Sequence, residues 1–165
     1  MKPLQEWFIN PAGRFGASSG LQASSDGTTK VLKRGIDYHR WVYKTMRTQH
    51  EFSKSPHELL IEPWFRTRKW DQRSPDMVLV DHEAKRALVI EVKLNWKAGR
   101  EQKLLNEYLP IVASAFRVET KPVLLTNCLR GWDGPVLLGL RQLSLAWDWK
   151  TGDELPVLLL PKRGA

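Results

Sequence analysis

The sequence holds one cysteine, Cys128, among its 165 residues, and it contains no long hydrophobic run. A single thiol cannot close a disulfide within the chain, and it cannot supply the cysteine cluster of a zinc or iron–sulfur site. We therefore expect a reducing compartment, the cytoplasm. Apolar runs such as residues 157–160 are far too short to cross a bilayer, so we expect no membrane partner.

Motifs that indicate other chemistries are also absent from the sequence. No Gly-rich phosphate loop of the P-loop type occurs, and we expect no nucleotide cofactor. His50, His57 and His82 lack the spacing of zinc ligands, and no Gly-x-Ser-x-Gly elbow marks a hydrolase serine. ATP hydrolysis, structural zinc and this type of serine hydrolysis are thus not indicated.

Acidic residues are fewer than basic ones, 18 against 26, which gives a formal net charge of +8. A basic chain attracts polyanions, and nucleic acid is the commonest such partner. Much of the excess lies in residues 30–47, opposed only by Asp37, and in residues 66–73, opposed only by Asp71. A solvated basic surface without a partner is the alternative interpretation. The candidate DNA-binding residues are Lys33, Arg34, Arg40, Lys44, Arg66, Arg68, Lys69, Arg73 and Lys97.

The order of predicted elements is typical of an α/β fold with one central mixed sheet. Residues 1–30 are expected to form a flexible N-terminal arm, whose apolar patch at residues 7–9 could dock on the body or on a second subunit. Within residues 31–165, Pro110 must kink or divide the second helix. The pattern predicts helices at 35–52 and 99–116, strands at 58–65, 76–81, 87–93 and 121–127, a basic hairpin region at 66–74, and peripheral strands at 136–140 and 157–160.

Two charges end the strand that is otherwise the most apolar. Side chains alternate across a strand, so Glu91 and Lys93 share one face of residues 87–93. Asp76 begins the preceding strand, and an antiparallel hairpin joined at residues 82–86 would place it opposite the end that carries Glu91 and Lys93. Desolvating these charges is costly unless they pair or meet a metal ion.

This set of groups suits hydrolysis of a phosphodiester. Asp76, Glu91 and the backbone carbonyl of Val92 would supply the oxygen ligands that Mg²⁺ prefers, with Mn²⁺ as the other candidate cofactor. The metal ion can polarise a phosphoryl oxygen, and Lys93 can stabilise charge on the pentavalent phosphorus. The opposing interpretation is a Glu–Lys pair on a solvated strand end, with Pro75-Asp76 as part of a turn.

Pro75-Asp76, followed after one hairpin by Glu91-Val92-Lys93, resembles the signature of the PD-(D/E)xK nucleases. The order helix, three strands, helix, strand is similar to that family's common core, and the resemblance covers roughly residues 35–127. It implies a single restriction-endonuclease-like domain over residues 31–165, and the similarity to phage-type endonucleases implies the cytoplasm of a bacterial or phage-infected cell. It also implies that Asp76 and Glu91 hold the metal ion and that Lys93 is the catalytic lysine.

A fourth position departs from the family's pattern. Members similar to Holliday-junction resolvases carry a glycine followed four residues later by glutamate on the first helix, whereas Gly35 is followed by His39. His39 could bind metal directly, act through water or contact phosphate, or it could simply pack beside the core. Asp37 should face away. Glu62 is a further candidate metal ligand, although a surface or ion-paired carboxylate is the simpler interpretation.

Aromatic residues accompany these charges. Trp64, Trp70 and Trp96 are interleaved with basic residues around the proposed site, and such aromatics can stack on unpaired bases. A role in the core or in a dimer interface is the favoured interpretation.

Together these features predict a metal-dependent DNA endonuclease, selective for branched DNA or junctions and acting as a homodimer. Two alternatives remain open. One is a catalytically degenerate DNA-binding subunit, and the other is a nuclease subunit of a larger restriction, transposition or recombination assembly.

Overall fold

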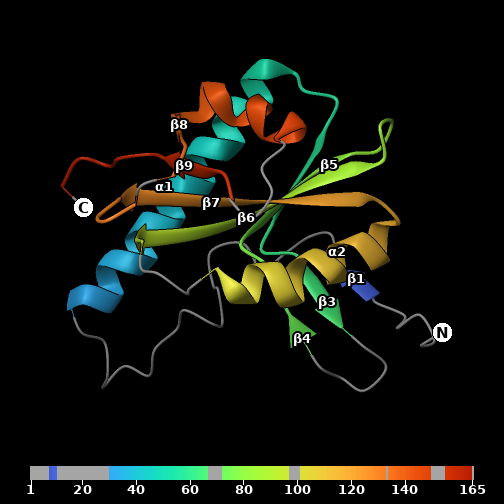
Figure 1. The fold of residues 1–165 in the computed structure, drawn as a ribbon, viewed down its shortest axis with the longest axis horizontal. Helices are drawn as coiled ribbons and strands as arrows, with labels where there is room; N and C mark the ends of the chain where they lie inside the picture. The colour runs from blue at the N-terminus through green and yellow to red at the C-terminus, as the bar shows by residue number, and fades with distance from the viewer. Residues whose placement is uncertain are drawn as a thin grey trace.

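The computed structural model describes residues 8–10, 30–66, 72–96, 101–132, 134–149 and 155–164, and it shows a mixed α/β fold (Figure 1). Its strands are β1 (Phe8–Asn10), β2 (Glu58–Ile61), β3 (Trp64–Arg66), β4 (Gln72–Arg73), β5 (Met77–Asp81), β6 (Arg86–Asn95), β7 (Glu119–Cys128), β8 (Val136–Leu138) and β9 (Val157–Leu159). Its helices are α1 (Lys30–Ser53), the π-helix η1 (Leu104–Tyr108), α2 (Leu109–Phe116) and the 3₁₀-helix η2 (Leu140–Asp148).

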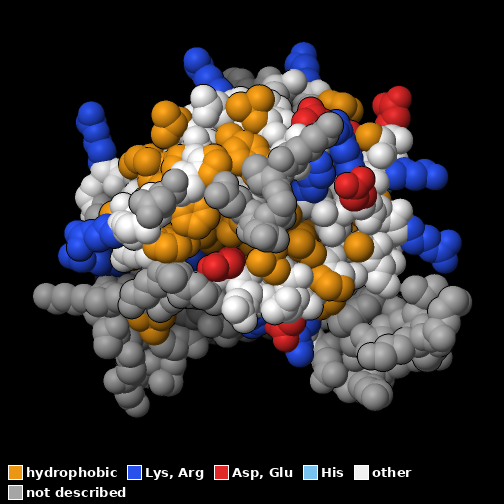
Figure 2. All heavy atoms as spheres, in the orientation of Figure 1, with side chains coloured by type: hydrophobic (Ala, Val, Ile, Leu, Met, Phe, Trp, Pro, Cys, Tyr) orange, Lys and Arg blue, Asp and Glu red, His pale blue; other side chains and the backbone are white. Residues whose placement is uncertain are grey.

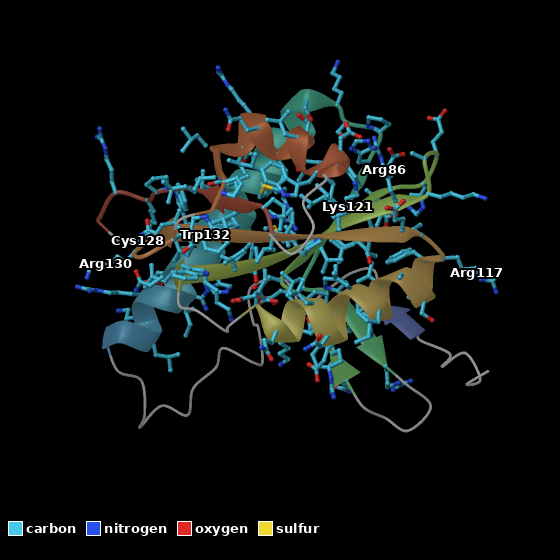
Figure 3. The ribbon with its side chains drawn as sticks, viewed as in Figure 1. Arg86, Arg117, Lys121, Cys128, Arg130 and Trp132 are labelled. Carbon is cyan, nitrogen blue, oxygen red and sulfur yellow. The ribbon has the colours of Figure 1, made fainter. Side chains whose placement is uncertain are left out.

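The central sheet is mixed, as predicted, with the strand order β2-β5-β6-β7-β9-β8. The pairs β2–β5 and β5–β6 are antiparallel, whereas β7 joins β6 in parallel and β9 joins β7 in parallel. Figure 3 shows Arg86 and Arg117 near the end of the sheet where β6 and β7 begin, and Cys128, Arg130 and Trp132 near the opposite end. Glu91 and Lys93 lie in the second half of β6, toward that opposite end.

Helices cover both faces of the sheet. On one face α1 and η2 pack on residues such as Leu88 and Ile90, and on the other η1 and α2 pack on Val78 and Val89. A small second sheet, with the order β1-β3-β4, lies on the α2 side, and its Phe65 contributes to the core there. The alternating apolar residues of β5 and β6 are buried on both faces, which explains their near-continuous hydrophobic sequence.

Three predictions about the elements are wrong, beyond shifts of a few residues at the ends of others. Helix α1 begins at Lys30 rather than at Gly35, because a glycine is tolerated inside a helix at a cost of about 1 kcal/mol. The predicted strand 58–65 divides into β2 and β3, since Glu62 has a left-handed φ of 48° and Pro63 cannot donate to a strand ladder. The strand at 157–159 is not peripheral: β9 lies between β7 and β8, and Val157 and Leu158 are fully buried.

Other predictions agree with the structure where it describes them. The second helical segment does divide, into η1 and α2, and Pro110 takes a first-turn position of α2, where its missing N–H costs little. The basic hairpin region pairs Arg66 with Gln72, and residues 67–71 between them lie outside the described residues.

The N-terminal segment is described only at β1. Phe8–Asn10 pair with β3, with Ile9 opposite Phe65, so this part of the expected arm docks on the body of the protein. The rest of residues 1–29 lies outside the described residues. Among the helices that the structure describes, none has the length and apolar character needed to traverse a bilayer.

Candidate active site

Asp76, Glu91 and Lys93 come together at the open end of the β5–β6 hairpin. Met77 pairs with Ile90, so Asp76 stands beside Glu91, and the backbone N–H of Val92 donates to Asp76 Oδ2 at 2.7 Å. Lys93 Nζ lies 3.7 Å from Glu91 Oε1. The predicted hairpin register is therefore correct, and it brings all three ionisable groups to one place.

Helix α1 brings two more side chains to the same carboxylate. His39 and Tyr43 are four residues apart and so share one face of the helix. Nε2 of His39 lies 3.5 Å from Asp76 Oδ2, and the Tyr43 hydroxyl donates to Asp76 Oδ1 at 3.2 Å. His39 is buried and faces the site, whereas Asp37 is exposed, as expected.

Glu62 also lies at the site, and its interpretation as a surface carboxylate is wrong. Its backbone N–H donates to the carbonyl oxygen of Asp76 at 2.8 Å, and the residue is only 6% exposed. Its carboxylate is hydrogen-bonded to the Tyr43 hydroxyl. The left-handed backbone at Glu62, which ends β2, turns this side chain inward.

The pKa values of the two central carboxyl groups, Asp76 and Glu91, are shifted in opposite directions. Burial raises the pKa of Asp76, but the His39 charge and hydrogen bond, the proton of Glu91 and the Val92 N–H together hold it well below its usual value. Burial and the adjacent Asp76 charge raise the pKa of Glu91 well above its usual value, and Lys93 opposes this only in part. Neighbouring carboxyl groups of this kind titrate as a pair that retains one proton.

His39 completes this charge arrangement. Burial lowers the pKa of its imidazole, but the Asp76 carboxylate and the Gly35 carbonyl raise it, and the net shift is upward. Nδ1 lies 2.8 Å from the Gly35 carbonyl oxygen, which can only accept, so Nδ1 carries a proton. Nε2 therefore faces Asp76 either as the second donor of an imidazolium or as a lone pair available to a cation.

The donor types fit a divalent cation. Two carboxyl groups and an imidazole converge, and Glu91 Oε2 is buried without receiving an N–H or hydroxyl donor from the described residues. In the part of the chain that the structure describes, however, no three His, Cys, Asp or Glu side chains already surround a common point. Binding a metal ion would thus require side-chain rotation, most simply of Glu91.

Two residues at the site were not predicted. Lys103, at the start of η1, opposes the rise in the pKa of Glu91, and its Nζ lies 5.5 Å from the centre of the Tyr108 ring. Tyr43 is the other, and its spacing of four residues from His39 was the signal that could have revealed it. π-Helical turns such as η1 are frequent at functional sites.

The predicted basic residues occupy two environments. Lys33, Arg34, Arg40 and Lys44 are exposed on α1, and Arg47 extends the same surface. We refer to Lys33, Arg40, Lys44 and Arg47, which recur every three to seven residues, as the α1 basic stripe. Arg66 is half-buried in β3, and Arg73 in β4 forms an ion pair of 3.8 Å with Glu107. The remaining candidates, Arg68, Lys69 and Lys97, and also Trp70, lie outside the described residues.

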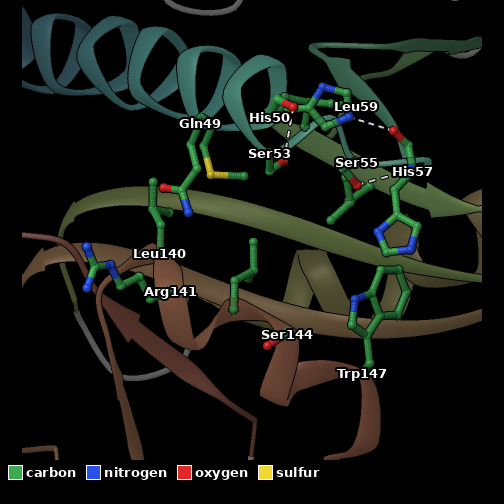
Figure 4. Close-up of a pocket in the computed structure, with 13 residues that line it drawn as sticks. Gln49, His50, Ser53, Ser55, His57, Leu59, Leu140, Arg141, Ser144 and Trp147 are labelled. Carbon is green, nitrogen blue, oxygen red and sulfur yellow. Dashed lines mark hydrogen bonds between the residues drawn. The ribbon is translucent and has the colours of Figure 1, made fainter.

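A separate pocket of about 400 Å³ lies on the α1 face, between α1, β2 and η2 (Figure 4). Its lining includes Met46, His57, Leu59 and Trp147, and it contains no carboxylate. It adjoins the beginning of β2, whereas Asp76 and Glu62 lie beyond the end of that strand. Its lining offers no carboxylate for a magnesium site, so the carboxylate cluster remains the candidate active site.

The sequence matches no model of a known protein family and no curated protein.

Proposed function

We propose that this protein is a metal-dependent nuclease that hydrolyses phosphodiester bonds of DNA. The observation that carries the proposal is the pair of carboxyl groups, the half-buried Asp76 and the buried Glu91, held side by side and flanked by Lys93 and His39. Placing two carboxyl groups together away from water is unfavourable unless a cation compensates them. Perturbed, coupled groups of this kind are typical of functional sites.

Asp76, Glu91, the carbonyl of Val92 and the Nε2 atom of His39 are the groups that would hold Mg²⁺ or Mn²⁺. Bound there, the ion would polarise the phosphoryl oxygen and favour ionisation of the attacking water. In the overall reaction, water provides the oxygen of the new phosphate monoester and, in net terms, the proton of the leaving hydroxyl group.

The chain's own groups have distinct tasks in this reaction. Lys93 is 31% exposed in its side chain, so its ammonium group can reach a bound phosphate and stabilise charge on the pentavalent phosphorus. The Val92 N–H and the Tyr43 hydroxyl fix the orientation of the Asp76 carboxylate. The Gly35 carbonyl fixes the tautomer and the ring orientation of His39.

The charge of the molecule favours a nucleic-acid substrate. The net charge of +8 and the α1 basic stripe would attract the phosphate backbone without reading its sequence. We therefore favour recognition of DNA structure, such as branches or junctions. A homodimer would allow two strands to be cut symmetrically.

The direct test is incubation of the purified protein with Mg²⁺ or Mn²⁺ and supercoiled, single-stranded or four-way-junction DNA. We expect cleavage of at least one substrate, and its loss in Asp76→Ala and in the presence of a chelator. The matched control is Asp148→Ala, which removes an exposed aspartate at the end of η2 and should cleave normally. If wild-type protein leaves all three substrates intact with both metals, the proposal fails.

A second candidate is a DNA-binding subunit with a degenerate site. The absence of a three-donor metal group among the described residues favours it. Calorimetric titration of wild type and Asp76→Ala with Mn²⁺ discriminates the two candidates. A protein that only binds DNA should show no Mn²⁺ binding that depends on Asp76. Weak activity restored by a partner protein would instead indicate a nuclease subunit of a larger assembly.

A further inference from the structure

The Tyr43 hydroxyl lies between two carboxylates, the half-buried Asp76 and the buried Glu62. It donates to Asp76 Oδ1 at 3.2 Å and is also hydrogen-bonded to Glu62. Tyr43 is 5% exposed and Glu62 6%. Burial, followed by the charges of Asp76 and Glu62, raises the pKa of Tyr43 far above its usual value, so the hydroxyl keeps its proton.

The backbone around Glu62 is built to hold this arrangement. A left-handed φ of 48° is unfavourable for a residue with a Cβ, and such strain persists only where the surroundings enforce it. The hydrogen bond from the Glu62 N–H to the Asp76 carbonyl ties the two segments together at 2.8 Å. A buried glutamate in a strained conformation is costly, and a simple turn between β2 and β3 does not require one.

One hydroxyl proton cannot serve both carboxylates fully. When Tyr43 donates to Asp76, Oδ1 of that carboxylate is occupied. When the O–H rotates toward Glu62, Oδ1 becomes available to a cation while the tyrosine stays in place. Oδ2 remains bound to the Val92 N–H in both cases, so the carboxylate keeps its orientation.

We propose that Tyr43 and Glu62 are positioning residues of the nuclease site, which hold Asp76 and release its Oδ1 to the metal ion by turning the tyrosine proton to Glu62. This inference rests on the proposed function. It assigns Glu62 a role through Tyr43 rather than direct binding of the metal ion.

The test compares Mn²⁺ affinity, measured by calorimetry, and steady-state cleavage in Tyr43→Phe, Glu62→Gln and the double variant. Removing a group that supports a metal ligand typically costs 10–100-fold in metal affinity or activity, and we expect this loss in Glu62→Gln, where the tyrosine proton stays on Asp76. Tyr43→Phe leaves Oδ1 without this competing donor, so it should bind Mn²⁺ at least as tightly as wild type. The loss in Glu62→Gln should appear in metal affinity and kcat, with the KM for DNA nearly unchanged. Because that loss depends on the Tyr43 proton, the double variant should bind Mn²⁺ more tightly than Glu62→Gln.

The chain offers a matched control on the same helix. Tyr38 is also buried, but its hydroxyl donates to the Leu160 carbonyl at 2.9 Å and not to a carboxylate of the site. Tyr38→Phe removes a hydroxyl group of the same kind and should leave Mn²⁺ affinity unchanged. Circular dichroism and thermal melting check that each variant is folded, and Glu62→Gln carries the test if Tyr43→Phe is not.

The outcomes separate this inference from the proposed function. If wild type binds Mn²⁺ and cuts DNA but Glu62→Gln matches Tyr38→Phe, the positioning role is wrong and the nuclease remains. A double variant that binds Mn²⁺ as weakly as Glu62→Gln would also overturn it, since the loss would then not depend on the Tyr43 proton. If wild type neither binds Mn²⁺ nor cuts DNA, the proposed function fails and this inference fails with it.

Discussion

At the scale of single residues, Lys93 differs from the carboxylates beside it because part of its side chain reaches solvent. Lys93→Ala should lower kcat by about 10²–10³-fold, the loss typical of removing one group that stabilises transition-state charge. DNA affinity and fold should change little. Single-turnover cleavage together with fluorescence anisotropy on labelled DNA measures both quantities, and an unchanged turnover would remove Lys93 from the catalytic set.

The raised pKa values of His39 and Glu91 predict how the stability of the metal-free protein depends on pH. Both groups have a raised pKa in the folded state, so the folded protein binds more protons than the unfolded chain. Their stabilising contribution is complete below their ordinary values of 4.5 and 6.5, and it is lost as pH rises through the folded values. Asp76 has the opposite effect, because its lowered pKa stabilises the fold above 3.8 and this contribution is lost as pH falls.

We therefore expect the free energy of unfolding in a chelator to fall as the pH rises from 5 to 8. Urea denaturation at several pH values measures it, and His39→Gln should flatten the slope at the upper end. His82→Gln is the matched control, because this exposed histidine lies outside the site. A metal-free protein that becomes more stable over this range would contradict the assigned charges.

At the scale of elements, the β5–β6 hairpin shows what the sequence could predict. Its two apolar runs are long and regular, so the pairing register is well specified. A slip by one residue would turn Glu91 and Lys93 to the other face of the sheet. The meeting of Asp76 with Glu91 followed from that register and was predicted correctly. The conformation of Glu62 could not be predicted, because a left-handed φ at a glutamate arises from its tertiary surroundings and not from local propensity.

Long-range pairing explains the other differences. The three residues of β9 form a short apolar run that carries no information about its neighbours in space. Its place between β7 and β8 depends on pairing with Leu124 and Val136, which are far from it in sequence. For the same reason the sequence placed His39 on the correct helix but left open whether it faced the site or the core.

The end of α2 offers a test at this scale. Arg117 ends the helix in the left-handed conformation, with φ of 54°, and its N–H donates to the Ala113 carbonyl. Glycine adopts this conformation without a steric penalty but loses more entropy on folding. We expect Arg117→Gly to stabilise the protein by about 0.5–1 kcal/mol, or about 1–4 °C in Tm. Thermal melting measures the shift, and Arg117→Ala, which keeps the Cβ, should give no gain.

At the scale of the whole molecule, one face carries both hydrophobic and basic side chains. Figure 2 shows hydrophobic side chains gathered in the middle of one face, with lysine and arginine side chains projecting around its outline. The α1 basic stripe lies on the solvent-exposed side of α1. The adjacent side of the same helix carries His39 and Tyr43, which contact Asp76. A DNA backbone bound along the stripe would therefore run beside the proposed site.

This placement predicts how Lys44, the exposed residue next to Tyr43 in sequence, contributes to binding. Lys44→Ala should weaken binding about equally for unrelated DNA sequences, and it should reduce the slope of log affinity against log salt by about 1, since one phosphate contact is lost. Fluorescence anisotropy between 50 and 200 mM salt, about the range in which such contacts are resolved, measures this slope. Lys85→Ala is the matched control: Lys85 is also exposed but lies in the β5–β6 turn, at the end of the hairpin away from Asp76. Equal slopes for wild type, Lys44→Ala and Lys85→Ala would show that the DNA does not follow α1, whereas a change confined to Lys44→Ala would place the backbone beside His39 and Asp76.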